Sequence, residues 1–176
     1  MAVLICAKAK SRRFPGKHFI EYKGLPLWKH TFNFAKKLGK EVFVFSDDDA
    51  MAELAVEYSF NFIRDIGGWK SDPQMDMMQY IHEKIKADVY IMLPITSPNR
   101  KLIQLLKCLS DFLKSSFAGS ATALTKIDRG NYKLSGAFWF FRKKQFYRSD
   151  VINENTMYFR MDSIDVDTPE DLKDEN

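Results

Sequence analysis

A group of cations lies near the amino terminus, directly after a short apolar run. Residues 8–17, Lys-Ala-Lys-Ser-Arg-Arg-Phe-Pro-Gly-Lys, contain five cations, one hydroxyl and a Pro-Gly turn. A nucleoside triphosphate carries about four negative charges, and ammonium and guanidinium groups stabilise both its binding and the charge that develops on leaving pyrophosphate. Composition alone leaves a solvated basic loop equally open. The segment does not match the Walker P-loop, so a triphosphate here needs a different kind of site.

A pair of carboxylates lies near the other end of the chain. Asp165 and Asp167 are two positions apart on a segment that we expect to be extended, so both side chains point to the same face. Such a pair suits Mg²⁺, which one or two carboxylates often hold while substrate phosphates and water complete its octahedron. The same residues also fit a helix start, with Thr168 as the cap and Pro169 as the first helical residue. Taken alone, the spacing favours the helix start over the metal.

The remaining polar candidates carry weaker signals. Residues 47–49 are three aspartates that follow a predicted strand, where they either face the same cleft or cap the next helix. The three histidines share no metal spacing, and we expect His30 and His82 on helix surfaces. No Gly-x-Ser-x-Gly is present, so nothing supports a serine hydrolase.

Composition and charge narrow the class of protein. The chain has 176 residues, of which 45% are hydrophobic, and this predicts one domain over 1–176. Six of its cations lie in the segment from Lys8 to Lys23, which contains the single acid Glu21. This segment therefore has a charge of +5, whereas the net charge of the whole chain is +4. One compact basic loop argues against nucleic-acid binding, which usually uses a whole face. No apolar run of about 18 residues occurs, so we expect a cytoplasmic protein without a membrane partner.

The elements that must position these groups alternate along the chain. Alternating strands and helices predict a three-layer α/β/α fold with a mostly parallel, doubly wound sheet, which places ligands at the carboxyl ends of its strands. The candidate residues all fall in loops that follow strands. We expect strands over 3–7, 42–45, 60–63, 89–93, 121–124, 137–141 and 157–166, and helices over 25–38, 50–58, 73–86, 100–114 and from 168 onward.

Taken together, these loops resemble the cytidylyltransferase family, above all CMP-sialic acid synthetases (acylneuraminate cytidylyltransferases). Residues 5–18 are similar to that family's opening Pro-Ala-Arg-Gly-Gly-Ser-Lys-Gly-Ile/Leu-Pro-Gly-Lys-Asn, and the form Ser-x-Arg-x-Pro-Gly-Lys is similar to CMP-Kdo synthetases. Each short match is weak, but their order and intervals make the set strong. The further matches are Gly24-Leu25-Pro26-Leu27, Ser46-Asp47-Asp48, Leu93-Pro94-Ile95-Thr96-Ser97-Pro98-Asn99-Arg100, Ser135-Gly136-Ala137 and residues 163–171, Ser-Ile-Asp-Val-Asp-Thr-Pro-Glu-Asp.

The resemblance implies a fold of the nucleotide-diphospho-sugar transferase type and an activity. It implies transfer of CMP from CTP to an acidic sugar, a sialic-acid-like nonulosonic acid or Kdo, with Mg²⁺ as cofactor, pyrophosphate as the second product and a homodimer as a possible assembly. It makes Asp165 and Asp167 the metal ligands and, with Lys8 and Lys17, the catalytic residues. The implied nucleotide-binding residues are Lys8, Ser11, Arg12 and Lys17 on the triphosphate, His18 against cytosine, Arg64 near the base, and Ser97.

The chain departs from the family pattern at several of these positions. Lys8 replaces an arginine and loses its bidentate fork, while His18 replaces an asparagine that reads the base. Residues 126–134 form a much shorter stretch than the family's sugar-binding and dimerisation region. The pattern predicts that nucleotide handling is better preserved than sugar handling, and it leaves open a catalytically reduced nucleotide- or sugar-nucleotide-binding module. The other departures are Ala9, Lys10 and Arg13 for glycines, Pro94 for a glutamine and Ser135 for an asparagine.

Overall fold

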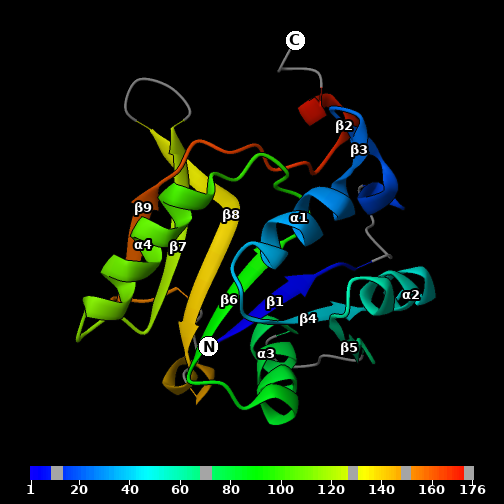
Figure 1. Ribbon diagram of the computed structural model, residues 1–176. Coiled ribbons are helices and arrows are strands. Elements are labelled where there is room, and N and C mark those ends of the chain that lie inside the picture. The colour runs from blue at the N-terminus through cyan, green and yellow to red at the C-terminus, as the bar shows by residue number, and fades with distance from the viewer. Residues whose placement is uncertain (9–13, 68–72, 127–130, 148–151, 173–176) are drawn as a thin grey trace.

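A single seven-stranded sheet forms the centre of the molecule (Figure 1). The computed structural model describes residues 1–8, 14–67, 73–126, 131–147 and 152–172. The strand order is β5-β4-β1-β6-β8-β7-β9. The bounds are β1 Ala2–Cys6, β4 Glu41–Ser46, β5 Asn61–Arg64, β6 Val89–Pro94, β7 Ser120–Lys126, β8 Tyr132–Arg142 and β9 Thr156–Arg160, and a separate two-stranded sheet pairs β2 Glu21–Tyr22 with β3 Leu25–Pro26.

The central strands β1, β4 and β6 are buried on both faces, as their continuous apolar runs predict. β1 pairs in parallel with β4 on one side and β6 on the other, with Val3 opposite both Val42 and Ile91. Successive residues of β1 point to opposite faces, because side chains alternate along a strand. Val3 and Ile5 join one buried cluster and Leu4 joins another.

Helices cover both faces, which gives the expected three layers. One face packs against α1 (Leu27–Lys36), α2 (Asp49–Glu57) and α4 (Leu102–Lys114), whose residues join the cluster that contains Val3 and Ile5. The other face packs against α3 (Pro73–Ile85), whose Met78 and Ile81 join the cluster around Leu4. No helix within the described ranges is long and apolar enough to cross a bilayer.

Strand β8 is the exception to the parallel sheet. It runs antiparallel to both β6 and β7, and at Tyr132–Arg142 it is longer than the predicted 137–141. The β7 and β8 strands form a hairpin instead of a crossover, so the chain needs no helix between them. The short region predicted over 126–134 falls at the tip of this hairpin, and its residues 127–130 lie outside the described chain.

Some predicted boundaries were wrong for local reasons. The first helix begins at Leu27 rather than at residue 25, because Leu25–Pro26 pairs with Glu21–Tyr22. Of the extended segment predicted over 157–166, only the part up to Arg160 belongs to a strand. The terminal helix is, where described, a short 3-10 turn, η3, at Pro169–Leu172.

Candidate active site

The segment that follows β9 turns back across the sheet toward the end of β6. The backbone N–H of Val166 donates to the carbonyl of Thr96 at 2.9 Å, and the N–H of Ile164 donates to Oδ1 of Asn99 at 3.1 Å. Both acceptors lie just beyond the carboxyl end of β6. These bonds carry Asp165 and Asp167 from the edge of the sheet to its centre, where parallel α/β sheets bind ligands.

Asp165 is held between two elements. Its Oδ1 accepts a hydrogen bond from the hydroxyl of Thr96 at 2.6 Å. Its Oδ2 lies 2.6 Å from the point where a Cβ on Gly136 would stand, so only glycine leaves room for this carboxylate. Burial raises the pKa of Asp165 and the negative charge of Asp167 adds to this, while the Thr96 hydrogen bond, Lys17 and Arg100 oppose it.

Lys17 joins the beginning and the end of the chain. It opens the 3-10 turn η1 (Lys17–Phe19) just after the basic loop, and its Nζ donates to Oδ1 of Asp167 and to the carbonyl of Val166, both at 3.2 Å. The Lys17 side chain is mostly buried, with 12% exposed, against 34% for Asp167. The basic segment and the distant acidic pair, both expected in loops that follow strands, therefore meet at this contact.

Arg100 is a polar residue of the site for which the sequence analysis predicted no role. Its guanidinium is buried and donates to the carbonyls of Pro94 and Ala137 and, at 3.1 Å, to the hydroxyl of Thr31. Burial lowers the pKa of Arg100 to about 9, and the attraction of Asp165 opposes that shift. The signal in the sequence was an arginine directly after the polar turn that follows a buried strand.

His18 lies in the interior, beside the turn that follows β4. It is fully buried, and its Nε2 lies 3.6 Å from Oδ2 of Asp48. Burial lowers the pKa of His18, and the nearby Asp48 opposes the shift. Asp48 also caps α2, because its Oδ1 accepts from the N–H of Ala50 at 3.0 Å. The contact of His18 with cytosine stays a prediction, and a base would reach this imidazole only if its surroundings moved.

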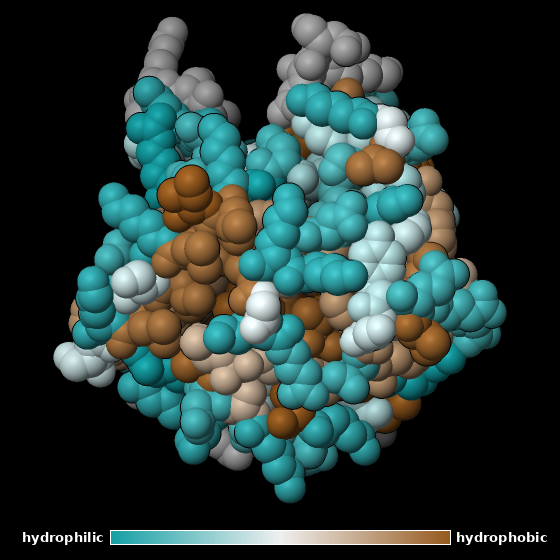
Figure 2. Space-filling model, viewed as in Figure 1, coloured by the Kyte–Doolittle hydropathy of each residue, from teal (hydrophilic) through white to brown (hydrophobic). Residues whose placement is uncertain are grey.

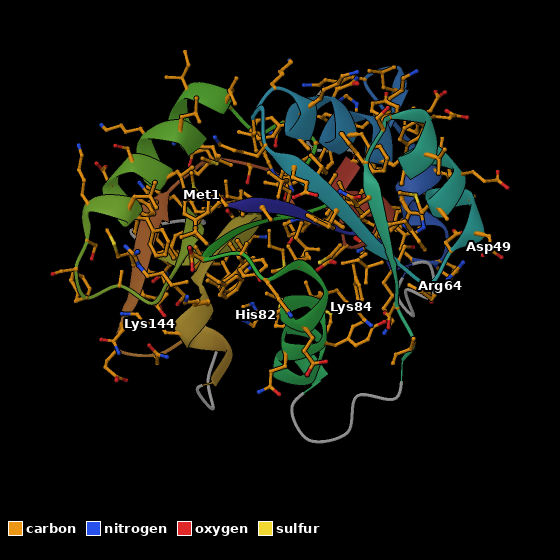
Figure 3. The ribbon with its side chains drawn as sticks, turned by 60° about the horizontal axis from the view of Figure 1, so that its bottom comes forward. Met1, Asp49, Arg64, His82, Lys84 and Lys144 are labelled. Carbon is orange, nitrogen blue, oxygen red and sulfur yellow. The ribbon has the colours of Figure 1, made fainter. Side chains whose placement is uncertain are left out.

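The other predicted nucleotide-binding residues lie in different places. Lys8 is exposed just after β1, whereas Ser11 and Arg12 are outside the described residues. Arg64, at the end of β5, pairs with Asp49 at 2.6 Å (Figure 3). Ser97 is fully buried after β6, and within the described parts of the chain its Oγ has no hydrogen-bond partner. Their roles stay predictions.

The carboxylate pair fits the coordination of Mg²⁺. Two carboxylates with phosphate and water oxygens are a common ligand set for this ion, so a cluster of three or more protein ligands is not needed. Where the chain is described, no group of three or more His, Cys, Asp or Glu residues gathers as a metal site. The mutual repulsion of Asp165 and Asp167 is what a bound cation would relieve.

The sheet, its covering layers and the polar groups at the strand ends define an α/β fold of the nucleotidyltransferase type. The chain belongs to the cytidylyltransferase family, whose model matches residues 2–145. A structure of CMP:2-keto-3-deoxy-manno-octonic acid synthetase complexed with CTP superposes with a TM-score of 0.79 at 19% identity, covering 98% of this chain and 95% of that one. A cytidylyltransferase from Leptospira borgpetersenii gives 0.74 at 16% identity, covering 97% and 82%.

One relative of this chain is named for a different activity, guanylyl transfer. A 2-phospho-L-lactate guanylyltransferase from Methanosphaera stadtmanae is 35% identical in an alignment 102 residues long, which covers 55% of this chain and 45% of that protein. The chain thus spans less than half the length of this relative.

Proposed function

We propose that this protein is a nucleotidyltransferase that moves CMP from CTP to an acidic sugar, a sialic-acid-like nonulosonic acid or Kdo, and releases pyrophosphate. The observation that carries the proposal is the contact of Lys17 with Asp167 beside the partly buried Asp165. A cation from the basic segment and two carboxylates from the far end of the chain thereby meet at the carboxyl edge of a parallel sheet. This edge is where such folds bind nucleotides.

The proposed roles follow the family resemblance, and the positions of Lys17, Asp165 and Asp167 support them. Lys8 and Lys17, with Ser11 and Arg12, hold the triphosphate. A sugar hydroxyl attacks the α-phosphorus in line, and the reaction depends on positioning and charge stabilisation rather than on a covalent enzyme intermediate. Mg²⁺, when held by Asp165 and Asp167, neutralises phosphate charge.

The residues behind the carboxylates keep them in place. Thr96 donates to Asp165, and Arg100 ties the end of β6 to β8 and α1 through its three acceptors. A carboxylate whose neighbours are already fixed loses little conformational freedom when it binds a cation. We propose that this rigidity positions Asp165 before the nucleotide arrives.

The first test is thermal unfolding with CTP, UTP, GTP or ATP, each with Mg²⁺. A ligand that binds only the folded state stabilises it by about 2.7 kcal/mol at a hundredfold excess over Kd. CTP should raise the melting temperature most. If none of the four nucleotides moves the melting curve, the proposal is wrong.

The second test measures pyrophosphate release from CTP with a panel of nonulosonic acids and Kdo. Release with any of these sugars supports the transferase and excludes the alternative, a catalytically reduced module of the same fold. The departures at Pro94 and over 126–134 motivate that alternative.

A second candidate activity follows from the guanylyltransferase relative at 35% identity. It is guanylyl transfer to a phosphorylated hydroxy acid. Pyrophosphate release from GTP with 2-phospho-L-lactate, in the absence of release from CTP with any sugar, would favour it.

A further inference from the structure

A basic pocket lies at the edge of the sheet opposite to the candidate active site. It has a volume of about 480 Å³, and its lining includes Lys114 at the end of α4, Arg142 at the end of β8, and Lys143 and Lys144 in the 3-10 turn η2 (Lys143–Tyr147). Four cations and the single acid Asp88 give this lining a net charge of +3. Figure 2 shows mostly hydrophilic side chains along this lower margin of the molecule. An excess of positive charge in a pocket attracts an anionic ligand.

Strand β6 separates the basic pocket from the candidate active site. Asp88 directly precedes β6, whereas Thr96, which holds Asp165, follows it. A strand of this length spans roughly 20 Å at about 3.3 Å per residue. Figure 3 shows Lys144 of the pocket far from Arg64, which ends β5 at the opposite edge. A small ligand in the basic pocket therefore occupies a site distinct from the proposed nucleotide site.

Arg142 is a cation that the end of α4 holds in one position. Its guanidinium donates to the carbonyls of residues 112, 113, 115 and 118 at distances of 2.9 to 3.2 Å, and it lies 5.0 Å from the ring of Phe112. Carbonyls at the end of a helix carry the negative end of its dipole, which repels anions unless a cation neutralises it. The bonds use Nε and Nη2, and Nη1 has no partner within the described ranges. Arg142 thus neutralises the helix end and keeps Nη1 for a ligand.

The three lysines of the pocket are exposed and can turn toward a ligand. Among the residues that the structure describes, neither Lys114 nor Lys144 has an ion-pair partner. Lys143 pairs with Asp88 at 2.9 Å, but the two side chains are 60% and 81% exposed, so solvent screens the pair and it is weak. A ligand with more than one negative charge can therefore draw Lys143 away from Asp88.

We propose that the basic pocket binds a small molecule that carries a phosphate group. Guanidinium and ammonium groups form charge-assisted hydrogen bonds to phosphate oxygens, and a net charge of +3 favours a dianion over a single carboxylate. The hydroxyls of Ser115 and Ser116 line the same pocket and can also donate. Small-molecule sites typically have volumes of about 300–1,000 Å³, so this one has room for an organic group beside the phosphate. Because its lysines are exposed, we expect a dissociation constant on the order of 0.1–1 mM at low salt.

Amide chemical shifts of the ¹⁵N-labelled native chain, titrated with glycerol phosphate at low salt and without Mg²⁺, test the proposal. The amides of residues 113–116 and 142–144 should move together and reach saturation. No saturating shift of these amides up to about 20 mM, which is well above the expected dissociation constant, would overturn the proposal. Shifts confined to the amides near Lys17 and Asp167 would belong to the proposed nucleotide site, and they would overturn it as well.

Two double variants with the same change in net charge separate the pocket from a general attraction of anions. Lys114→Ala with Lys144→Ala removes two lysines of the pocket and should raise the dissociation constant at least about fivefold. Lys101→Ala with Lys107→Ala is the matched control, because these exposed lysines of the same helix region do not line the pocket. It should change the constant less than about twofold. Equal weakening by both double variants would show that no defined site exists.

Asp88→Asn should have the opposite effect. It removes the only acid of the pocket and releases Lys143, so glycerol phosphate should bind at least about twofold more tightly. A loss of affinity in this variant would contradict the proposed role of the pocket charges.

Vesicles that contain phosphatidic acid distinguish the source of the phosphate group. The same charges could meet the headgroup of a lipid, but the proposal requires a soluble ligand. The native chain should therefore not float with these vesicles at an ionic strength at which glycerol phosphate still shifts the pocket amides. Flotation without any response to glycerol phosphate would assign the pocket to a membrane surface and overturn the proposal.

Discussion

Asp165 is a carboxylate that the fold partly shields from water before any ligand binds. Burial raises its pKa, yet Thr96 donates to it and the guanidinium of Arg100 lies close enough to oppose that rise. The side chain is thus fixed in position without a full set of charge-compensating partners. Such a group has most to gain from a cation.

Asp165→Asn should separate the proposed catalytic role of this residue from its structural role. The amide oxygen can still accept from Thr96, so the melting temperature should change by no more than a few degrees. Nucleotidyl transfer should fall on the order of 100-fold, because the variant loses the charge that we propose acts on the metal and phosphates. Asp162→Asn, at a carboxylate whose side chain is 70% exposed, is the control and should keep its activity. Undiminished transfer by Asp165→Asn would remove the residue from the mechanism.

Gly136 is the neighbour of Asp165 at which a single methyl group should matter. Its φ is +61°, and a Cβ there would stand 2.6 Å from Oδ2 of Asp165. Gly136→Ala combines left-handed backbone strain of about 1 kcal/mol with this collision. Gly24→Ala, at φ +78° with nothing within 4 Å, carries the strain alone. In urea unfolding, Gly136→Ala should cost at least about 1 kcal/mol more than Gly24→Ala and should also lower activity. Equal costs would show that Asp165 moves aside freely.

Among the elements, the 3-10 turn η1 connects the basic segment to the β4–α2 turn. His18 of η1 lies against Asp48, which caps α2, and Ser46 at the end of β4 donates to the carbonyl of Ala7 at 2.5 Å. These contacts fix both sides of the loop that follows β1. The position of Lys17 therefore depends on a buried imidazole one residue away.

The buried His18 predicts a pH dependence of stability. Its pKa is lowered from 6.5 in the folded state, so below pH 6.5 the unfolded chain binds more protons than the folded one. The contribution of uncharged His18 to the free energy of unfolding is complete above pH 6.5. It decreases as the pH falls below that value, by at most about 1.4 kcal/mol per pH unit. His18→Gln should flatten the urea-unfolding profile between about pH 6.5 and 5. Identical profiles for the two proteins would show that His18 titrates normally.

At the scale of the whole molecule, the Lys17 and Asp167 pair closes the chain upon itself. The two residues are 150 positions apart, and their contact holds η1 against the segment that returns from β9. Since Lys17 also donates to the carbonyl of Val166, the contact fixes backbone as well as charge. The proposed phosphate and metal groups thus share one support.

A double-mutant cycle measures this closure. Lys17→Met and Asp167→Asn should each destabilise the fold, and their coupling energy should be about 0.5–1 kcal/mol, because Asp167 is partly exposed and its charge is screened by solvent. The coupling should decrease in high salt. The pair Lys143 and Asp88, with side chains 60% and 81% exposed, is the control and should couple more weakly. Additive effects of the Lys17 and Asp167 substitutions would mean that the two segments are held together by other contacts.

The sequence by itself determined the alternation of strands and helices, the buried parallel centre and the loops in which the polar residues lie. These follow from apolar periodicity and turn residues, which are local. It did not determine the antiparallel course of β8, because an apolar run carries no direction. Nor could it bring the charge of Arg100 near Asp165 or place His18 against Asp48. Those interactions join residues 30 to 65 positions apart, and only the packing of the sheet and its helices decides which distant side chains lie near one another.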